Sequence, residues 1–175
     1  EHYKWKRRVG DEGLVPTLIP DALYLPAFLM ENKQFILSCL RDISTIEDLL
    51  KVGLERATDY VCELRRFGIE VFVLIGSEFA SESRMNPRFY DRLVQKHEAE
   101  LVRIIHESNG FCITHMDGRI GSLIDKIAET GTDAVHPLEA PPSGNVDIKM
   151  AKERIGDKVC LMGNLAISDM LTGQT

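Results

Sequence analysis

Phe111-Cys-Ile-Thr-His-Met-Asp117 is a short apolar run that ends in chemically active side chains. Two later segments, Ala134-Val-His-Pro-Leu-Glu139 and Val159-Cys-Leu-Met-Gly-Asn164, have the same character. Helical patterns separate the three runs, which predicts parallel neighbouring strands. Parallel strands end at one common edge, where open α/β sheets and (β/α) barrels both place their active sites. The side chains expected at that edge are His115, Asp117, His136, Glu139 and Asn164.

The composition is that of one globular domain over residues 1–175, with 44% hydrophobic and 27% charged residues. A net charge of -6 argues against a nucleic-acid partner, and the basic cluster over residues 4–8 is too short to reverse this. No apolar run approaches the roughly 20 residues of a membrane helix. The four cysteines are far apart, with no Cys-x-x-Cys pair, which favours reduced thiols and a cytoplasmic location.

The rest of the chain alternates strand and helix patterns. Val71-Phe-Val-Leu-Ile75 is apolar throughout, as a strand buried on both faces should be. Ser44-Thr-Ile-Glu47 predicts a capping box, followed by a long amphipathic helix that ends near Gly68. The fold class is therefore α/β, and a (β/α) barrel is favoured over an open doubly wound sheet because no Gly-x-Gly-x-x-Gly or Gly-Lys-Ser/Thr motif is present.

The expected number of strands is too small for a complete barrel. The pattern gives about five strand–helix units, whereas a closed (β/α) barrel has eight strands and typically about 250 residues. We therefore expect an incomplete TIM-barrel type domain, truncated at both ends. Its two free sheet edges would be exposed or covered by a second copy in a homo-oligomer.

Several blocks, taken in order, resemble the uroporphyrinogen decarboxylase superfamily. They are Phe28-Leu-Met-Glu-Asn-Lys-Gln-Phe35, Ile113-Thr-His-Met-Asp-Gly118, Ile127-Ala-Glu-Thr-Gly-Thr-Asp-Ala-Val-His136, Pro137-Leu-Glu-Ala-Pro-Pro142 and Leu161-Met-Gly-Asn164. The superfamily also contains zinc-dependent methyltransferases, which move a methyl group from a methylated corrinoid to a thiol. The resemblance implies the (β/α) barrel fold and one of these two activities.

The resemblance also implies roles for particular residues. Where the methyltransferases carry a zinc-binding His-x-Cys-Gly, this chain has His115-Met-Asp117-Gly118, so His115 and Asp117 would bind zinc or another divalent metal. Glu139 would be a third ligand or a general base, and Asn164 a substrate-facing amide. Other interpretations stay open: Asp117 caps a helix beginning near Arg119, Glu139 pairs with a basic side chain, His136 is a packed or surface residue, and Asn164 bonds its own loop.

Methyl transfer between a methylated corrinoid and a thiol is the function that this sequence favours. The corrinoid would be carried by a partner protein, and the metal would lower the pKa of the acceptor thiol. Decarboxylation of a tetrapyrrole is the alternative, but Phe28 stands at the position of the tyrosine that the decarboxylases use, and Gly76 at that of a strand-end acid. A third hypothesis is a fragment or binding scaffold without catalytic activity.

Overall fold

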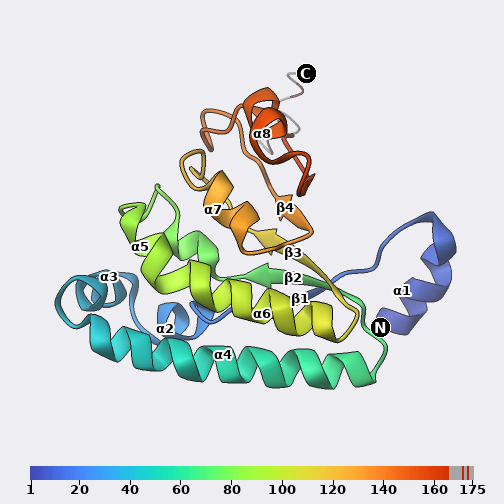
Figure 1. The fold of residues 1–175 in the computed structure, drawn as a ribbon, viewed down its shortest axis with the longest axis horizontal. Coiled ribbons are helices and arrows are strands. Elements are labelled where there is room, and N and C mark those ends of the chain that lie inside the picture. Colours follow the sequence, from blue (N-terminus) through green and yellow to red (C-terminus); the bar gives the residue numbers. More distant parts are fainter. Residues whose placement is uncertain (166–170, 172, 174–175) are drawn as a thin grey trace.

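A computed structural model describes residues 1–165, 171 and 173 of the chain (Figure 1). The strands are β1 (Thr17–Pro20), β2 (Val71–Ile75), β3 (Phe111–His115), β4 (Ala134–His136) and β5 (Cys160–Leu161). The main helices are α1 (His2–Val9), α2 (Tyr24–Leu29), α3 (Asn32–Arg41), α4 (Ile43–Arg66), α5 (Arg88–Tyr90), α6 (Lys96–Glu107), α7 (Ile124–Glu129) and α8 (Ile148–Ile155). A π-helical turn, η3 (Asp91–Gln95), joins α5 to α6, and 3-10 turns lie at η1 (Gly10–Glu12) and η2 (Ser77–Ala80).

The five strands form one parallel sheet in the order β1-β2-β3-β4-β5. At least one helix lies between each strand and the next, as a parallel connection requires. The order is strictly sequential, whereas a doubly wound sheet reverses its order at a switch point. The connectivity is therefore that of a (β/α) barrel.

The two faces of the sheet have different neighbours, which also identifies the fold. On one face Ile19, Phe72 and Cys112 belong to a buried cluster with residues of α4 and α6. On the other face the cluster contains strand residues alone, namely Val71, Val73, Ile113 and Ala134. A doubly wound sheet carries helices on both faces, while a barrel keeps its inner face for strand side chains. We therefore call the helix-free side the inner face.

The sheet is open, because β1 and β5 each pair on one side only among the described strands. Part of the inner face is accordingly accessible: Leu18 is 63% exposed and Phe111 58% exposed. The chain thus has an α/β fold of the TIM-barrel type with five β/α units, short of the eight strands of a closed barrel. In Figure 1, α4 and α6 run side by side, while α1 stands apart from them.

The predicted start of the long helix was wrong by two residues, because its N-cap is Asp42 and not Ser44. Helix α4 begins at Ile43, and the Asp42 carboxylate accepts from the backbone N–H of Thr45 and from the Ser44 hydroxyl, at 3.4 and 3.0 Å. Glu47 does not close a capping box, because its carboxylate binds the Arg92 guanidinium at 2.7 Å. An aspartate before the first turn is the stronger acceptor, since it is charged and faces the positive end of the helix.

Candidate functional site

The carboxyl ends of the strands lie at one edge, as the sequence predicted, and carry most of the polar candidates. His115 ends β3 and His136 ends β4, and they are direct partners in the parallel ladder. Since paired residues on neighbouring strands point to the same face, both imidazoles lie on the inner face, in line with Ile113 and Ala134. Each side chain is half-buried.

The two imidazoles contact each other directly. Nδ1 of His115 lies 2.9 Å from Nδ1 of His136, and the ring centroids are 5.1 Å apart. At this distance one Nδ1–H donates to the lone pair of the other Nδ1. The donor ring then has a free lone pair on Nε2, while the acceptor ring carries an N–H there. The neutral pair therefore offers one proton acceptor and one proton donor.

The surroundings favour the neutral form of His136. Burial lowers the pKa of His136, the neighbouring His115 lowers it further, and the Glu139 carboxylate acts in the opposite direction. A histidine whose pKa lies below its ordinary value is unprotonated at neutral pH. The sequence alone suggested that His136 is a packed or surface residue. In the structure it contacts His115, the histidine that the resemblance singled out.

Glu139 ties two strand-end loops together. Its Oε2 accepts a hydrogen bond from the backbone N–H of Gly118 at 2.7 Å, which links the loop after β4 to the loop after β3. Gly118 has a φ of 81°, a conformation that glycine adopts readily. The carboxylate is therefore engaged with the backbone and not with a basic side chain.

Asp117 is half-buried and does not act as a helix cap. Helix α7 begins at Ile124, well beyond Arg119, and its N-cap position is Leu123. The interpretation of Asp117 as the cap of a helix beginning near Arg119 is therefore wrong. A role for Asp117 at the strand-end edge stays a prediction.

The three predicted metal ligands are not grouped in the structure. No three His, Cys, Asp or Glu side chains within residues 1–165, 171 and 173 are placed to hold an ion together. His115 has its Nδ1 against His136, and Glu139 has Oε2 on the backbone N–H of Gly118, so each side chain has one of its two donor atoms engaged outside such a site. The arrangement does not fit a three-ligand site made by His115, Asp117 and Glu139.

Asn164 follows β5 and joins it to the loop after β4. Its Nδ2 donates to the carbonyl oxygen of Leu138 at 2.5 Å. Gly163, with a φ of 133°, runs so close to Leu138 that a Cβ on it would lie 2.8 Å from the Leu138 nitrogen. The amide therefore holds the chain at this close approach, and a contact with substrate stays a prediction.

A second polar group, which the sequence analysis missed, lies behind the sheet on the helix side. Asp21 follows β1, and Glu98 comes from α6; both are almost wholly buried. Thr114 directly precedes His115 in β3, so its side chain points to the opposite, helix-covered face of the sheet. There its Oγ1 donates to Glu98 Oε1 at 2.5 Å. Glu98 stands in the apolar stripe of its helix, in register with Leu101 and Ile105, and this was the one signal in the sequence.

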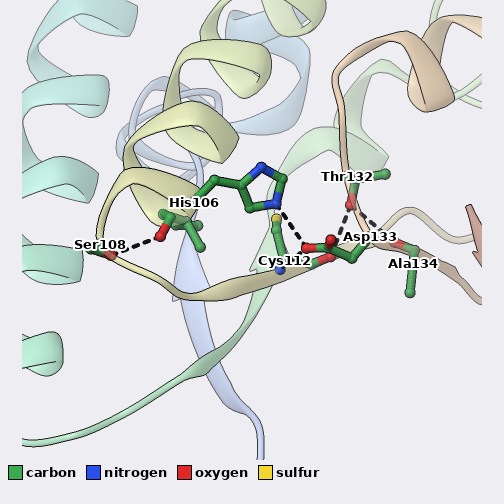
Figure 2. Close-up of polar contacts among 7 residues, drawn as sticks. His106, Ser108, Cys112, Thr132, Asp133 and Ala134 are labelled. Carbon is green, nitrogen blue, oxygen red and sulfur yellow. Dashed lines mark hydrogen bonds and ion pairs between the residues drawn. The ribbon is translucent and has the colours of Figure 1, made fainter.

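The opposite, amino-terminal edge of the sheet carries a network that fixes the strands (Figure 2). Asp133 Oδ2 accepts from the backbone N–H of Cys112 at 2.7 Å and lies 2.9 Å from Nε2 of His106. The Thr132 hydroxyl lies 3.1 Å from the carbonyl oxygens of Cys112 and Ala134. In (β/α) barrels this edge serves stability and not catalysis.

Two hollows lie beside β1 and β5, the end strands of the described sheet, and the histidine pair does not line either of them. One of about 700 Å³ is lined by Pro20, Tyr24, Arg56, Asp59, Tyr60, Glu63 and Ile75, beside β1. Another of about 600 Å³ borders β5 and α8, with Cys160, Leu161 and Lys152 among its residues.

The sequence matches the family model of uroporphyrinogen decarboxylase (URO-D) over residues 23–175, which is most of the chain. The chain belongs to the uroporphyrinogen decarboxylase family. No curated protein matches it. Among the described residues, no helix has both the length and the apolar character needed to cross a membrane. Membership confirms the predicted superfamily and its barrel fold but does not separate methyl transfer from decarboxylation.

Proposed function

We propose that this member of the uroporphyrinogen decarboxylase family transfers a methyl group from a methylated corrinoid to a thiol, and that the His115–His136 pair takes the proton of the thiol. The observation that carries the proposal is the 2.9 Å contact between the two Nδ1 atoms at the carboxyl edge of the sheet. That edge is where (β/α) barrels do their chemistry. The blocks around His115 that resemble the methyltransferases support the same assignment.

The proposed step is a proton transfer followed by a displacement. The thiol gives its proton to the free Nε2 of the ring that donates through Nδ1, and the pair becomes singly protonated. The thiolate then attacks the methyl carbon, forming a sulfur–carbon bond. The cobalt–carbon bond breaks, and its electron pair stays on the corrinoid, whose cobalt is reduced by two electrons. Atoms and charges balance without a further reactant.

The lowered pKa of His136 keeps this imidazole unprotonated, so that it is available as a proton acceptor and not as a proton donor in the imidazolium form. Thiolate formation requires a proton acceptor, whereas decarboxylation in this family requires a proton donor to carbon. Phe28 also lacks the hydroxyl of the decarboxylase tyrosine; its ring instead stacks on Tyr24 with centroids 3.9 Å apart. These observations favour methyl transfer over decarboxylation.

The proposed proton transfer and displacement need no metal ion. Zinc or another divalent ion is implied by the resemblance, with His115 and Asp117 as ligands, but among the described residues no third His, Cys, Asp or Glu side chain is placed to complete such a group. The histidine pair alone supplies the acceptor that a thiol needs.

The test is methylcorrinoid demethylation by the full-length protein with a thiol acceptor, followed by visible absorbance. A general base contributes on the order of 100- to 10,000-fold to a rate, so His115→Gln and His136→Gln should each lower the rate by at least about 100-fold. His106→Gln is the matched control, since that imidazole lies at the opposite edge of the sheet. Unchanged rates in both variants, or release of carbon dioxide from a porphyrinogen without demethylation, would refute the proposal.

A second experiment, in which demethylation is measured after treatment with a chelator, tests separately whether a metal ion is required. The histidine-pair mechanism predicts that wild-type demethylation continues after exhaustive chelation. Loss of the rate on chelation, with recovery on adding zinc, would overturn the metal-free step and restore His115 as a metal ligand. The pH profile gives a further check, because the rate should rise as the pair loses its extra proton.

A further inference from the structure

Asp21 and Glu98 form a buried carboxyl pair that the proposed reaction does not use. Their side chains are only 3% and 2% exposed. Both border one closed hollow between the end of β1 and α6, with no room for a water molecule. The remaining lining is Ala22, Leu23, Leu93, Val94 and His97. Two acids therefore share one dry, largely apolar place.

Each of the two carboxyl groups, Asp21 and Glu98, has one oxygen with a hydrogen-bond partner and one without. Asp21 Oδ1 accepts from the backbone N–H of Tyr24 at 2.9 Å, and Glu98 Oε1 accepts from Thr114 at 2.5 Å. The second oxygen of each carboxyl, Asp21 Oδ2 and Glu98 Oε2, is buried and has no hydrogen-bond partner of accepted geometry within the described residues. The same holds for the neighbouring Tyr90 hydroxyl. A bare carboxylate oxygen in such a place is costly, whereas a shared proton would satisfy it.

The charges around the pair are negative or neutral. No lysine or arginine forms an ion pair with Asp21 or Glu98 in the part of the chain that the structure describes. His97 borders the same hollow, and burial lowers its pKa, so it brings no positive charge. The acidic groups that act on the cluster from neighbouring elements are Glu78 of η2 and Asp91 of η3.

The π-helical turn η3 explains how Tyr90 and Glu98 come to the same side. In a regular α-helix, residues eight positions apart point about 80° away from each other. A π turn inserts one extra residue, so the two become equivalent to a pair seven apart, which differ by only about 20°. Such turns are frequent at functional sites. The turn over Asp91–Gln95 thus adds the Tyr90 hydroxyl to the carboxyl pair.

We propose that Asp21, Glu98 and Tyr90 form a proton-holding cluster, in which at least one proton is retained by the two carboxyls at neutral pH and clamps α6 to the segment after β1. Ionisation of the cluster places a second negative charge in the dry hollow and weakens this clamp. The cluster is therefore a pH-sensitive device beneath the strand-end loops. It does not depend on which reaction the protein catalyses.

The clamp bears on the loops at the carboxyl edge. Asp21 lies against Gly76 after β2: a Cβ on Gly76 would lie only 2.2 Å from Asp21 Oδ1. Gly76 in turn donates its backbone N–H to Glu78 at 2.6 Å. Tyr24, which binds the Asp21 carboxylate, also lines the hollow beside β1. Movement at Asp21 would therefore displace the first two strand-end loops and the wall of that hollow.

The direction of the pH effect follows from the sign of the shift. Burial raises the pKa of Glu98 to about 7, and burial together with Glu98 raises that of Asp21. An acid with a raised folded-state pKa contributes stability that is fully present below its unfolded value and is lost as the pH rises through the folded value. For Glu98 the loss runs from its ordinary pKa of 4.5 to about 7.

Chemical unfolding of the full chain at two pH values tests the proposal. Between about pH 5 and pH 8 the Glu98 shift should lower the folding equilibrium constant roughly 70-fold. Glu98→Gln should remove most of this decrease, because the amide cannot ionise. Glu100→Gln is the matched control: it lies on the same helix but is exposed and paired with Arg103 at 2.7 Å. The same decrease in all three proteins would overturn the proposal.

Infrared spectroscopy gives a readout that does not require the variant to fold. The wild-type protein at neutral pH should show the carbonyl band of a protonated, buried carboxylic acid, and the band should fade as the pH rises above about 7. The band should persist in Glu100→Gln. If Glu98→Gln fails to fold, the wild-type titration decides alone: a spectrum with only ionised carboxylates at neutral pH would refute the cluster.

Discussion

Substituting alanine for Gly53 should destabilise the protein, although alanine is the better helix former. Gly53 is buried in the middle of α4, where the helix crosses the start of α2. A Cβ at this position would lie 2.3 Å from the carbonyl oxygen of Ala22 and 3.1 Å from its Cα. Both contacts are with backbone, so neither can be relieved by rotating a side chain.

The magnitude is the balance of two opposing terms. Replacing glycine by alanine within a helix gains about 1 kcal/mol. Overpacking against a fixed neighbour costs about 1–3 kcal/mol, and here α4 must move away from Ala22 as a whole. We expect Gly53→Ala to lower the free energy of unfolding by about 1–2 kcal/mol, which in a domain of this size lowers Tm by roughly 2–8 °C.

Urea unfolding followed by circular dichroism measures this difference. The midpoint should fall while the slope stays unchanged, because the same surface is exposed on unfolding. Val52→Ala is the matched control; its side chain is 43% exposed on the same turn, so its effect should stay within about 0.5 kcal/mol. A Gly53→Ala protein as stable as wild type would show that α4 does not approach the Ala22 backbone so closely.

Two further predictions concern the ends of the structural elements. Asp42→Ala should lower the free energy of unfolding by about 1 kcal/mol and Ser44→Ala by less, since Asp42 is the N-cap of α4; a larger effect of Ser44 in the same urea titration would restore the predicted capping box. Asp133→Ala should cost about 1–3 kcal/mol, because it leaves the backbone N–H of Cys112 unpaired. The demethylation rate per folded molecule should not change in Asp133→Ala, and a large fall would contradict the structural role of the amino-terminal edge.

The repeating elements could be predicted from the sequence because local rules fix them. Val71–Ile75 is apolar throughout and became β2 with the predicted bounds. The helical pattern around Ile148 to Ile155 likewise predicts the helix that is α8. Helix boundaries were harder to predict. The apolar pattern from about Ala27 to Leu40 predicts one helix, but the structure interrupts it at Met30, whose φ of -114° and ψ of 149° are extended. No proline or glycine marks this break, so no local signal announces it.

The contacts of the candidate site were harder to predict than its place. Alternation along β3 put His115 on the inner face, but its contact with His136 depends on the register between β3 and β4. Glu139 and Asn164 bind backbone groups of the neighbouring loops, which a pattern of residue types does not reveal. The buried acids were missed because Asp21 and Glu98 are far apart in the sequence and come together only where α6 packs against the segment after β1.

Alternation along β3 connects the two polar clusters of this edge. Thr114 points to the helix side and binds Glu98, while His115 points to the inner face and contacts His136. The two side chains share one peptide unit, so the strand cannot shift toward one cluster without moving the other. Each cluster consequently restricts the position of the other, and the proton held behind the sheet helps to keep the histidine pair at its 2.9 Å separation. A strand end of this kind fixes the histidine pair more firmly than a loop could, because both faces of the strand end are bound.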